Sequence, residues 1–234
     1  MLRGSVEAFD RHPWFGALSE ARRTALIRAT RVQRWNDLEF VYRLGDPPDG
    51  LYAVANGVVR LYGRGRADAP ALEAILGPGE WFGALSLLDG RPRPHDAVSS
   101  GRSSLLHLSM DAVRDLFAAA PGLHHDLVAL VCQQFRTALA VRSGTAAAGS
   151  RQRLLNVLLG GAEALAAAPG SRPLAAALSQ EDLAALAGVS RHTVHRILKS
   201  LQHDGVLDLQ HGRLNVVDLE ALRARTHAGA ATPK

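Results

Sequence analysis

The sequence predicts an α+β chain with a β-rich N-terminal domain, a long connecting helix and a small C-terminal domain of short helices. Three observations lead to this prediction. Residues 32–110 hold short runs of β-forming residues separated by glycines, residues 111–143 repeat apolar residues at helical steps, and residues 179–216 hold two short helical runs followed by two short strand-like runs. The 234 residues, 47% of them hydrophobic, suffice for two modest domains with buried cores.

Composition narrows the class of protein. The 27 basic and 22 acidic residues leave a net charge of +5, which allows a nucleic-acid partner without proving one. A single cysteine, Cys132, excludes an intrachain disulfide, a CxxC site and a multi-cysteine iron–sulfur centre. The N-terminus lacks a signal-peptide pattern, and no window approaches about 18 uninterrupted apolar residues. We therefore expect a cytoplasmic protein with no membrane partner.

The N-terminal region is predicted to start with a helical segment over 13–30, with Ser19 as its N-cap and Glu20 in its first turn. From 32 to 110, turn signals recur roughly every 8–12 residues, as in an all-β sandwich or barrel. The stretch "RGRADAPA" is predicted to be an exposed hairpin tip. Glycines stand where tight turns are expected: Gly45, Gly50, Gly57, Gly77, Gly79 and Gly83.

The next region is helical. "DAVRDLFAAAP" predicts a short helix ending near Pro121, and "GLHHDLVALVCQQFRTALAVRS" predicts a longer one. Its partly polar seam indicates a helix–helix interface between two copies, and an ordinary core helix is the alternative. The expected interface residues are Leu123, Leu127, Leu130, Val131, Gln134 and Ala138. "SGTAAAGS", at 143–150, is predicted to be a flexible joint and a domain boundary.

The C-terminal region opens with a predicted helix over 151–170 and continues with two short helices. Ser179 precedes the first of these, and Asp182 follows at the spacing of a capping box. Gly188 lies in the turn, and Ser190 caps the second helix. "VLDL" and "RLNVV", joined by "QHG", form a hairpin that completes a winged-helix order, followed by a last helical turn at "DLEALRAR".

The second of these helices has two different faces. Its apolar residues fall within roughly 100° of each other, and its basic and imidazole residues cover a separate arc of about 140°. The first set is Val194, Ile197, Leu198 and Leu201, and the second is Arg191, His192, His195, Arg196 and Lys199. Arginine can donate to guanine O6 and N7, and lysine can reach phosphates, so the polar face suits a DNA major groove. The alternative is a solvated surface.

Two motifs together resemble the Crp/Fnr (catabolite activator) family. "LSQEDLAALAGVSRHTVHRILKSLQHDGVL" is similar to its DNA-binding motif, and "GDPPDGLYAVANGVVRLY" is similar to its cyclic-nucleotide-binding β-roll. The resemblance spans about residues 12–222 in the family's order. It implies a double-stranded β-helix (β-roll or jelly-roll) sensor at 1–118, a dimerisation helix and hinge at 119–147, a winged helix-turn-helix at 148–226 and a disordered tail at 227–234.

The resemblance also implies which residues contact DNA. Arg191 and Arg196 match the family's base-reading arginines, whereas His192 stands where the family has Glu. Neutral imidazole both donates and accepts hydrogen bonds, so we expect an altered base preference there. Ser179 and Gln180 match positions that touch phosphate. The expected DNA-binding residues are Arg191, His192, His195, Arg196, Lys199, Ser179, Gln180 and Ser190.

The ligand site departs from the family pattern. Members that bind cyclic AMP carry Gly-Glu near the start of a phosphate cassette and Arg-Ser/Thr-Ala near its end. Here Gly83 precedes Ala84, and His95-Asp96 stand before Ala97 with Arg93 displaced. The resemblance therefore implies a sensor that is either degenerate or retuned away from cyclic AMP. The small-molecule effector is unknown, and a different cyclic-nucleotide-like ligand is one alternative. The expected pocket residues are Trp81, Phe82, Gly83, Ala84, Leu85, Ser86, Arg93, His95, Asp96 and Ala97.

The function implied is a homodimeric transcription regulator that binds a pseudo-palindromic double-stranded DNA operator through a recognition helix at 190–202 and contacts RNA polymerase. Two alternatives are a regulatory module acting through protein contacts and a haem-based gas sensor with a histidine ligand. The haem candidates are His95, His107, His124 and His125. The sequence holds no nucleophile elbow, P-loop or metal triad, so we expect neither an enzyme nor a metal site.

Overall fold

The structure is a computed structural model that describes residues 3–64, 70–147, 149–166, 179–210 and 213–230. Contacts divide the chain into two compact units, Met1–Thr137 and Ala138–Lys234. The division falls inside a helix and not at the predicted joint. Among the described residues, no helix combines the length and apolar character needed to cross a bilayer.

Three short helices open the first unit: α1 (Arg3–Arg11), α2 (Pro13–Ala17) and α3 (Glu20–Ala29). The caps are local, because the His12 ring accepts from Phe15 N and Ser19 Oγ accepts from Arg22 N. The N-cap predicted at Ser19 is confirmed, whereas α1 was not predicted.

An antiparallel sheet follows, in which two long strands pair along most of their length. Its strands are β1 (Arg31–Trp35), β2 (Phe40–Tyr42), β3 (Gly50–Arg64), β4 (Pro70–Leu76), β5 (Trp81–Phe82) and β6 (Asp96–Ser109). The order is β1-β6-β3-β4, with β2 also paired to β6 and β5 to β3. Register shifts between Val54 and Val58 bend the β3–β6 pair. The β-rich domain is therefore confirmed, while the tip of "RGRADAPA" at 65–69 lies outside the described residues.

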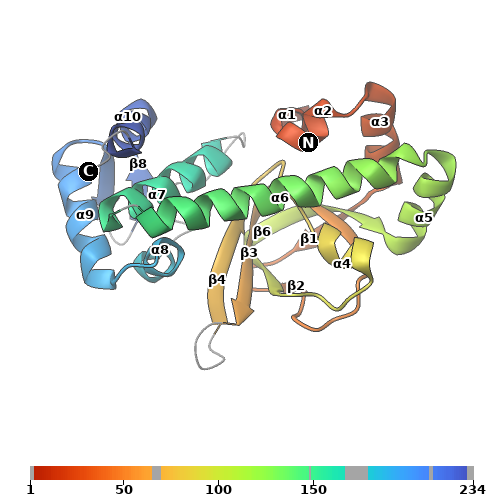
Figure 1. The fold of residues 1–234 in the computed structure, drawn as a ribbon, viewed down its shortest axis with the longest axis horizontal. Helices are drawn as coiled ribbons and strands as arrows, with labels where there is room; N and C mark the ends of the chain where they lie inside the picture. Colours follow the sequence, from red (N-terminus) through yellow and green to blue (C-terminus); the bar gives the residue numbers. More distant parts are fainter. Residues whose placement is uncertain (1–2, 65–69, 148, 167–178, 211–212, 231–234) are drawn as a thin grey trace. The chain divides into compact units, whose positions relative to one another are not determined.

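Three further helices complete this part: α4 (Ala84–Asp89), α5 (Met110–Ala119) and α6 (Gly122–Ala147). The short helix α4, inside a stretch predicted as strands, was not anticipated. Residues 143–147 continue α6, so this part of the predicted flexible joint is helical, which Ala146 and Ala147 favour although Gly144 does not. Figure 1 shows α1–α3 on one side of α6, with strands β3 and β4 on the other.

Two cores hold the first unit together. One lies inside the sheet and includes Tyr42, Tyr52 and Phe82. The other joins the sheet to the helices and includes Trp14, Phe15, Trp81 and three leucines of α6. The rings of Phe15 and Trp81 stack with centroids 5.6 Å apart. The start of α6 is therefore an integral part of the β domain.

The second unit contains a helix-turn-helix and a hairpin. Its elements are α7 (Ser150–Ala166), α8 (Gln180–Ala187), α9 (Arg191–His203), β7 (Leu207–Gln210), β8 (Arg213–Val216) and α10 (Leu219–Ala230). Strands β7 and β8 are antiparallel, as a wing requires. Helix α10 extends to Ala230, so residues 227–230 are helical and not the predicted disordered tail. Residues 211–212 of the hairpin and 231–234 lie outside the described part of the chain.

Candidate functional sites

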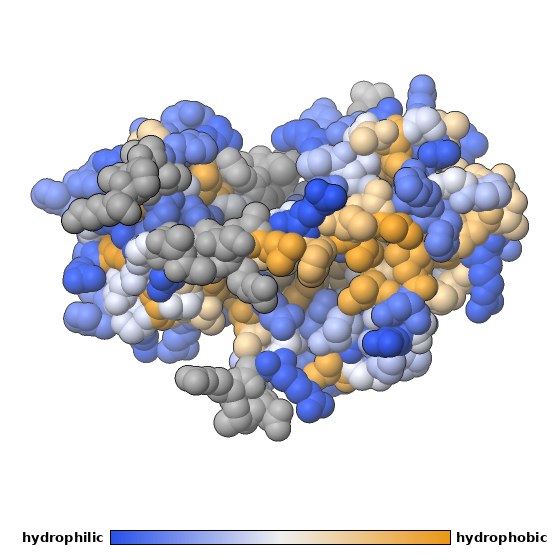
Figure 2. All heavy atoms as spheres, in the orientation of Figure 1, coloured by the Kyte–Doolittle hydropathy of each residue, from blue (hydrophilic) through white to orange (hydrophobic). Residues whose placement is uncertain are grey.

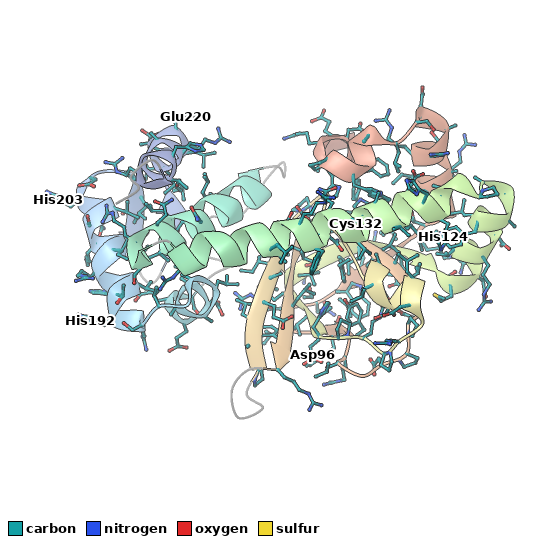
Figure 3. The ribbon with its side chains drawn as sticks, in the orientation of Figure 1. Asp96, His124, Cys132, His192, His203 and Glu220 are labelled. Atoms are coloured by element: carbon teal, nitrogen blue, oxygen red, sulfur yellow. The ribbon has the colours of Figure 1, made fainter. Side chains whose placement is uncertain are left out.

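Helix α9 presents the predicted polar face to solvent. Val194, Ile197, Leu198 and Leu201 are at most 4% exposed, which orients the helix on its domain. Ser190 Oγ accepts from Thr193 N at 3.2 Å and caps the first turn. Figure 3 shows His192 near one end of α9 and His203 at the other. The structure brings five exposed side chains together on this face: Arg191, His192, His195, Arg196 and Lys199.

Helix α8, which precedes the turn before α9, is capped at both of its ends. Ser179 and Asp182 form the predicted capping box, with reciprocal bonds of 3.1 and 2.8 Å. Gly188 adopts a φ of 59° and closes the helix, as a glycine does without strain. Arg153 of α7 donates to Ala187 O and Gly188 O at 2.8 and 3.1 Å. Nothing in the local sequence pointed to Arg153, because its partners lie more than thirty residues away.

An ion pair joins the beginnings of α8 and α9. Arg191 Nη1 lies 3.0 Å from Glu181 Oε1, and their side chains are 70% and 73% exposed. Gln180 is half-buried beside Glu181, and Ser179 is exposed. The ion pair thus places the start of α8, where Ser179 and Gln180 are predicted to touch phosphate, next to Arg191, which is predicted to read a base.

The β domain buries an arginine at the start of α4. The Arg93 guanidinium is 1% exposed and donates to Gly83 O at 2.9 Å and Gly50 O at 2.8 Å. It also pairs with the Asp49 carboxylate. Gly83 has a φ of 88°, which favours glycine, and a Cβ there would lie 2.6 Å from Arg93 Nη1 and would displace that guanidinium. The expected pocket residue Arg93 thus lies beside Gly83, although in the sequence it stands before the position at which the family carries its arginine.

Aromatic rings enclose the same guanidinium. Its Cζ lies 4.3 Å from the centre of the Tyr42 ring and 5.9 Å from that of Tyr52. Tyr52 OH donates to Asp49, and burial raises the pKa of both tyrosine hydroxyls, which stay protonated. The charge of Arg93 is thus compensated within the chain, and an anionic ligand would have to compete with Asp49.

Helix α6 has two apolar faces, and the predicted interface residues lie mostly on the one that packs against its own domain. Leu123, Leu127 and Leu130 are at most 1% exposed and pack in the core of their own domain, so they cannot contact a second chain. Val131 packs partly against that core, Gln134 donates to Trp81 O at 2.7 Å, and Ala138 is exposed.

The opposite face of α6 carries exposed apolar residues. Val128, Phe135 and Leu139 are 37%, 63% and 37% exposed, and Cys132 is exposed between them. We call these four residues the α6 seam. Their spacing of four, three and four residues is that of a coiled-coil interface. Figure 2 shows apolar surface gathered along α6.

Comparison with known proteins identifies the family. Residues 32–120 match the cyclic nucleotide-binding domain, and residues 152–225 match the Crp-like helix-turn-helix domain. A cyclic AMP receptor protein of Thermus thermophilus is 35% identical over 176 residues, which cover 75% of this chain and 79% of that protein. The chain belongs to the Crp family of transcriptional regulators.

A further relative and a solved structure are consistent with this family assignment. A CRP-like cAMP-activated global transcriptional regulator of Mycobacterium tuberculosis is 27% identical, covering 79% of this chain and 83% of that protein. The structure of FixK2 from Bradyrhizobium japonicum has a TM-score of 0.71 at 19% identity, covering 88% of this chain and 99% of that one, and shows the shared fold. The predicted family, fold class and DNA-binding function are confirmed, and the Crp family comprises regulators, not enzymes.

Within this Crp-family site, the other predicted pocket residues differ in their surroundings. Ser86 is buried, and its hydroxyl donates to Pro92 O. Leu85 is 49% exposed. The interior residues are Trp81, Phe82, Ala84 and Ala97, at most 3% exposed, and they build the cores of the Crp-type β domain.

His95 and Asp96, at the end of the same segment, are both engaged. His95 Nε2 lies 2.9 Å from Tyr42 OH, and Asp96 Oδ1 accepts from Leu44 N at 2.7 Å. Burial, with a smaller effect of Arg93, lowers the pKa of His95 to about 4. His95 is therefore neutral near pH 7 and supplies no charge to an anion. The haem alternative gains no support at His107 either, whose ring nitrogens lie within hydrogen-bonding distance of Gln33 and Asp49.

Because His95 is neutral in the folded chain, we expect the folded protein to lose stability in acid. The pKa of His95 falls from 6.5 in the unfolded chain to about 4 in the folded one, so between these values only the unfolded chain takes up the proton. The stabilisation is complete above pH 6.5, and about 3 kcal/mol is lost as the pH falls to 4. We expect His95→Gln to flatten this dependence in urea titrations. The exposed control, His203→Gln, should follow wild type, and parallel curves for all three proteins would contradict the assignment.

Proposed function

We propose that this Crp-family protein is a homodimer that reads a pseudo-palindromic operator through α9 and responds to a small molecule other than cyclic AMP. The observation that carries the proposal is the exposed row of five donor side chains on a capped helix. A twofold axis would place two such helices in successive major grooves, about 34 Å apart. RNA polymerase is the proposed protein partner, by likeness to the family. The operator itself is found by selecting duplexes from a random pool with the full-length protein.

The α6 seam supports the homodimer. Exposed apolar residues at heptad spacing are stable when a second helix covers them, and a parallel copy of α6 presents the same spacing. Phe135, 63% exposed in the single chain, contributes the largest apolar side chain to this contact. The proposed interface is therefore Val128, Cys132, Phe135 and Leu139.

A cysteine cross-link tests the seam directly. In a parallel, in-register pair, Cys132 of one chain faces Cys132 of the other, and the chain has no other cysteine. We expect mild oxidation to give a cross-linked dimer on a non-reducing gel. The control is Thr137→Cys in a Cys132→Ser background, because residue 137 lies about 140° around the helix from 132. Equal or faster cross-linking of that control would contradict the seam.

The changed ligand site supports an effector other than cyclic AMP. The Ala84 side chain has no oxygen to accept a hydrogen bond from a ribose hydroxyl, and Asp49 already neutralises Arg93. We expect calorimetry with cyclic AMP to show binding no tighter than about 1 mM, equal to that of 5′-AMP. Saturation in the micromolar range would refute this part of the proposal, and the relatives named for cyclic AMP serve as positive controls.

A further inference from the structure

We infer that Glu181 is a specificity-determining residue, which weakens binding to non-operator DNA and holds Arg191 ready for the operator. The inference rests on the proposed function, because it concerns the same DNA-reading surface. It starts from the ion pair between Glu181 of α8 and Arg191 of α9.

The geometry singles out Glu181 among the acidic residues of α8. Its neighbour Asp182 is engaged by the capping box with Ser179. Glu181 instead reaches across to Arg191, ten residues later, with its Oε1 3.0 Å from Nη1. Because both side chains are about 70% exposed, packing does not fix them, and the ion pair is a weak contact that biases each side chain toward the other. The carboxylate thus lies beside Arg191, and Glu181 follows Gln180 in the chain, on the surface proposed to face DNA.

The carboxylate opposes the general attraction of this surface for phosphate. The beginnings of α8 and α9 carry partial positive charge, and Arg191 adds a full one at the first residue of α9. Any duplex would be attracted there through its phosphates, regardless of sequence. Glu181 cancels one unit of that charge, so binding to non-operator DNA is weakened.

The ion pair between Glu181 and Arg191 weakens binding to the operator less than it weakens binding to other DNA. A guanidinium has five N–H donors, so Arg191 can keep Glu181 on one edge and direct others to a guanine. A side chain already held in place also loses less rotamer freedom when it binds. Repulsion by Glu181 therefore acts on all duplexes, whereas the ordering of Arg191 favours only duplexes with the right base. The specificity ratio, which is the affinity for the operator divided by the affinity for other DNA, therefore rises.

The test compares Glu181→Gln with a matched control, Glu220→Gln. Glu220 pairs with Arg223 at 2.6 Å, is 80% exposed and lies on α10, away from His192 (Figure 3). Affinities are measured over a salt series for the operator selected by wild type and for a scrambled duplex. We expect Glu181→Gln, which removes one carboxylate from each subunit, to tighten binding to the scrambled duplex about tenfold, or roughly threefold per subunit. Operator affinity should stay within about twofold, so the ratio falls. The control should leave the ratio unchanged.

A second comparison separates the two effects of Glu181. In an Arg191→Ala background, Glu181→Gln should still tighten binding to the scrambled duplex but no longer affect recognition of the base. An unchanged specificity ratio in Glu181→Gln, or an equal change in the control, overturns the inference. If wild type selects no duplex at all, the proposed function itself fails, and the inference fails with it.

Discussion

Replacing Arg191 and Arg196 together by alanine is expected to abolish operator binding while the protein stays folded and dimeric. Each well-placed arginine–guanine contact is worth about 1–3 kcal/mol, and a dimer makes each contact twice. The combined loss is at least about 4 kcal/mol, which is close to a thousandfold in affinity. Both side chains are exposed, so no core contact is lost with them.

Fluorescence anisotropy with the selected duplex measures this loss, and sedimentation reports the oligomeric state. The charge-matched control is Arg223→Ala with Arg225→Ala, two arginines of α10 that pair with Glu220 and Asp204. We expect the control to lose little affinity. Retained operator binding in the Arg191/Arg196 variant would instead favour a module that acts through protein contacts.

The second large effect is expected from Phe135→Asp, which should convert the dimer to monomers. Burying an aromatic ring of this size contributes about 2–3 kcal/mol, and the twofold axis doubles the contribution. Two unpaired carboxylates in the apolar seam add the cost of desolvation and mutual repulsion. The dimer dissociation constant should therefore rise by at least about a thousandfold, with loss of operator binding as a consequence.

Analytical ultracentrifugation across a concentration series measures the dissociation constant. The matched control is Val32→Asp, because Val32 is 53% exposed on β1 and not on α6. The control should remain dimeric. A dimeric Phe135→Asp protein would show that another surface holds the two chains together, and the α6 seam would then lose its proposed role.

The helix-turn-helix was predictable from the sequence because its signals are local. Ser179 and Asp182 are three residues apart and cap the same turn, and Gly188 ends the helix that they begin. The apolar and polar faces of α9 follow from the helical repeat alone, and the structure buries the residues at Val194 and Ile197 as that repeat requires. Propensity, caps and periodicity are properties of neighbouring residues, so one sequence suffices to recognise them.

The buried arginine was placed only by the tertiary structure. Arg93 meets Asp49 and Gly50, more than forty residues earlier in the chain, because β3 and the segment before β6 come together at the start of α4. Sequence spacing showed only that Arg93 stands before the position of the family's arginine, since the conformation of the intervening residues decides where a long side chain ends.

The two apolar faces of α6 also separate what the sequence predicts from what the tertiary structure decides. The sequence by itself determined that residues 122–143 form a helix with apolar residues at three- and four-residue steps. Both Leu127 and Phe135 fit that repeat, so periodicity could not tell the core face from the exposed seam. Trp14 and Trp81, each more than forty residues from Leu127 in the sequence, pack in the same core as Leu127. Phe135 has no place in that core and stays exposed. A helix buries the face that its distant neighbours cover, and those neighbours are known only once the chain is folded.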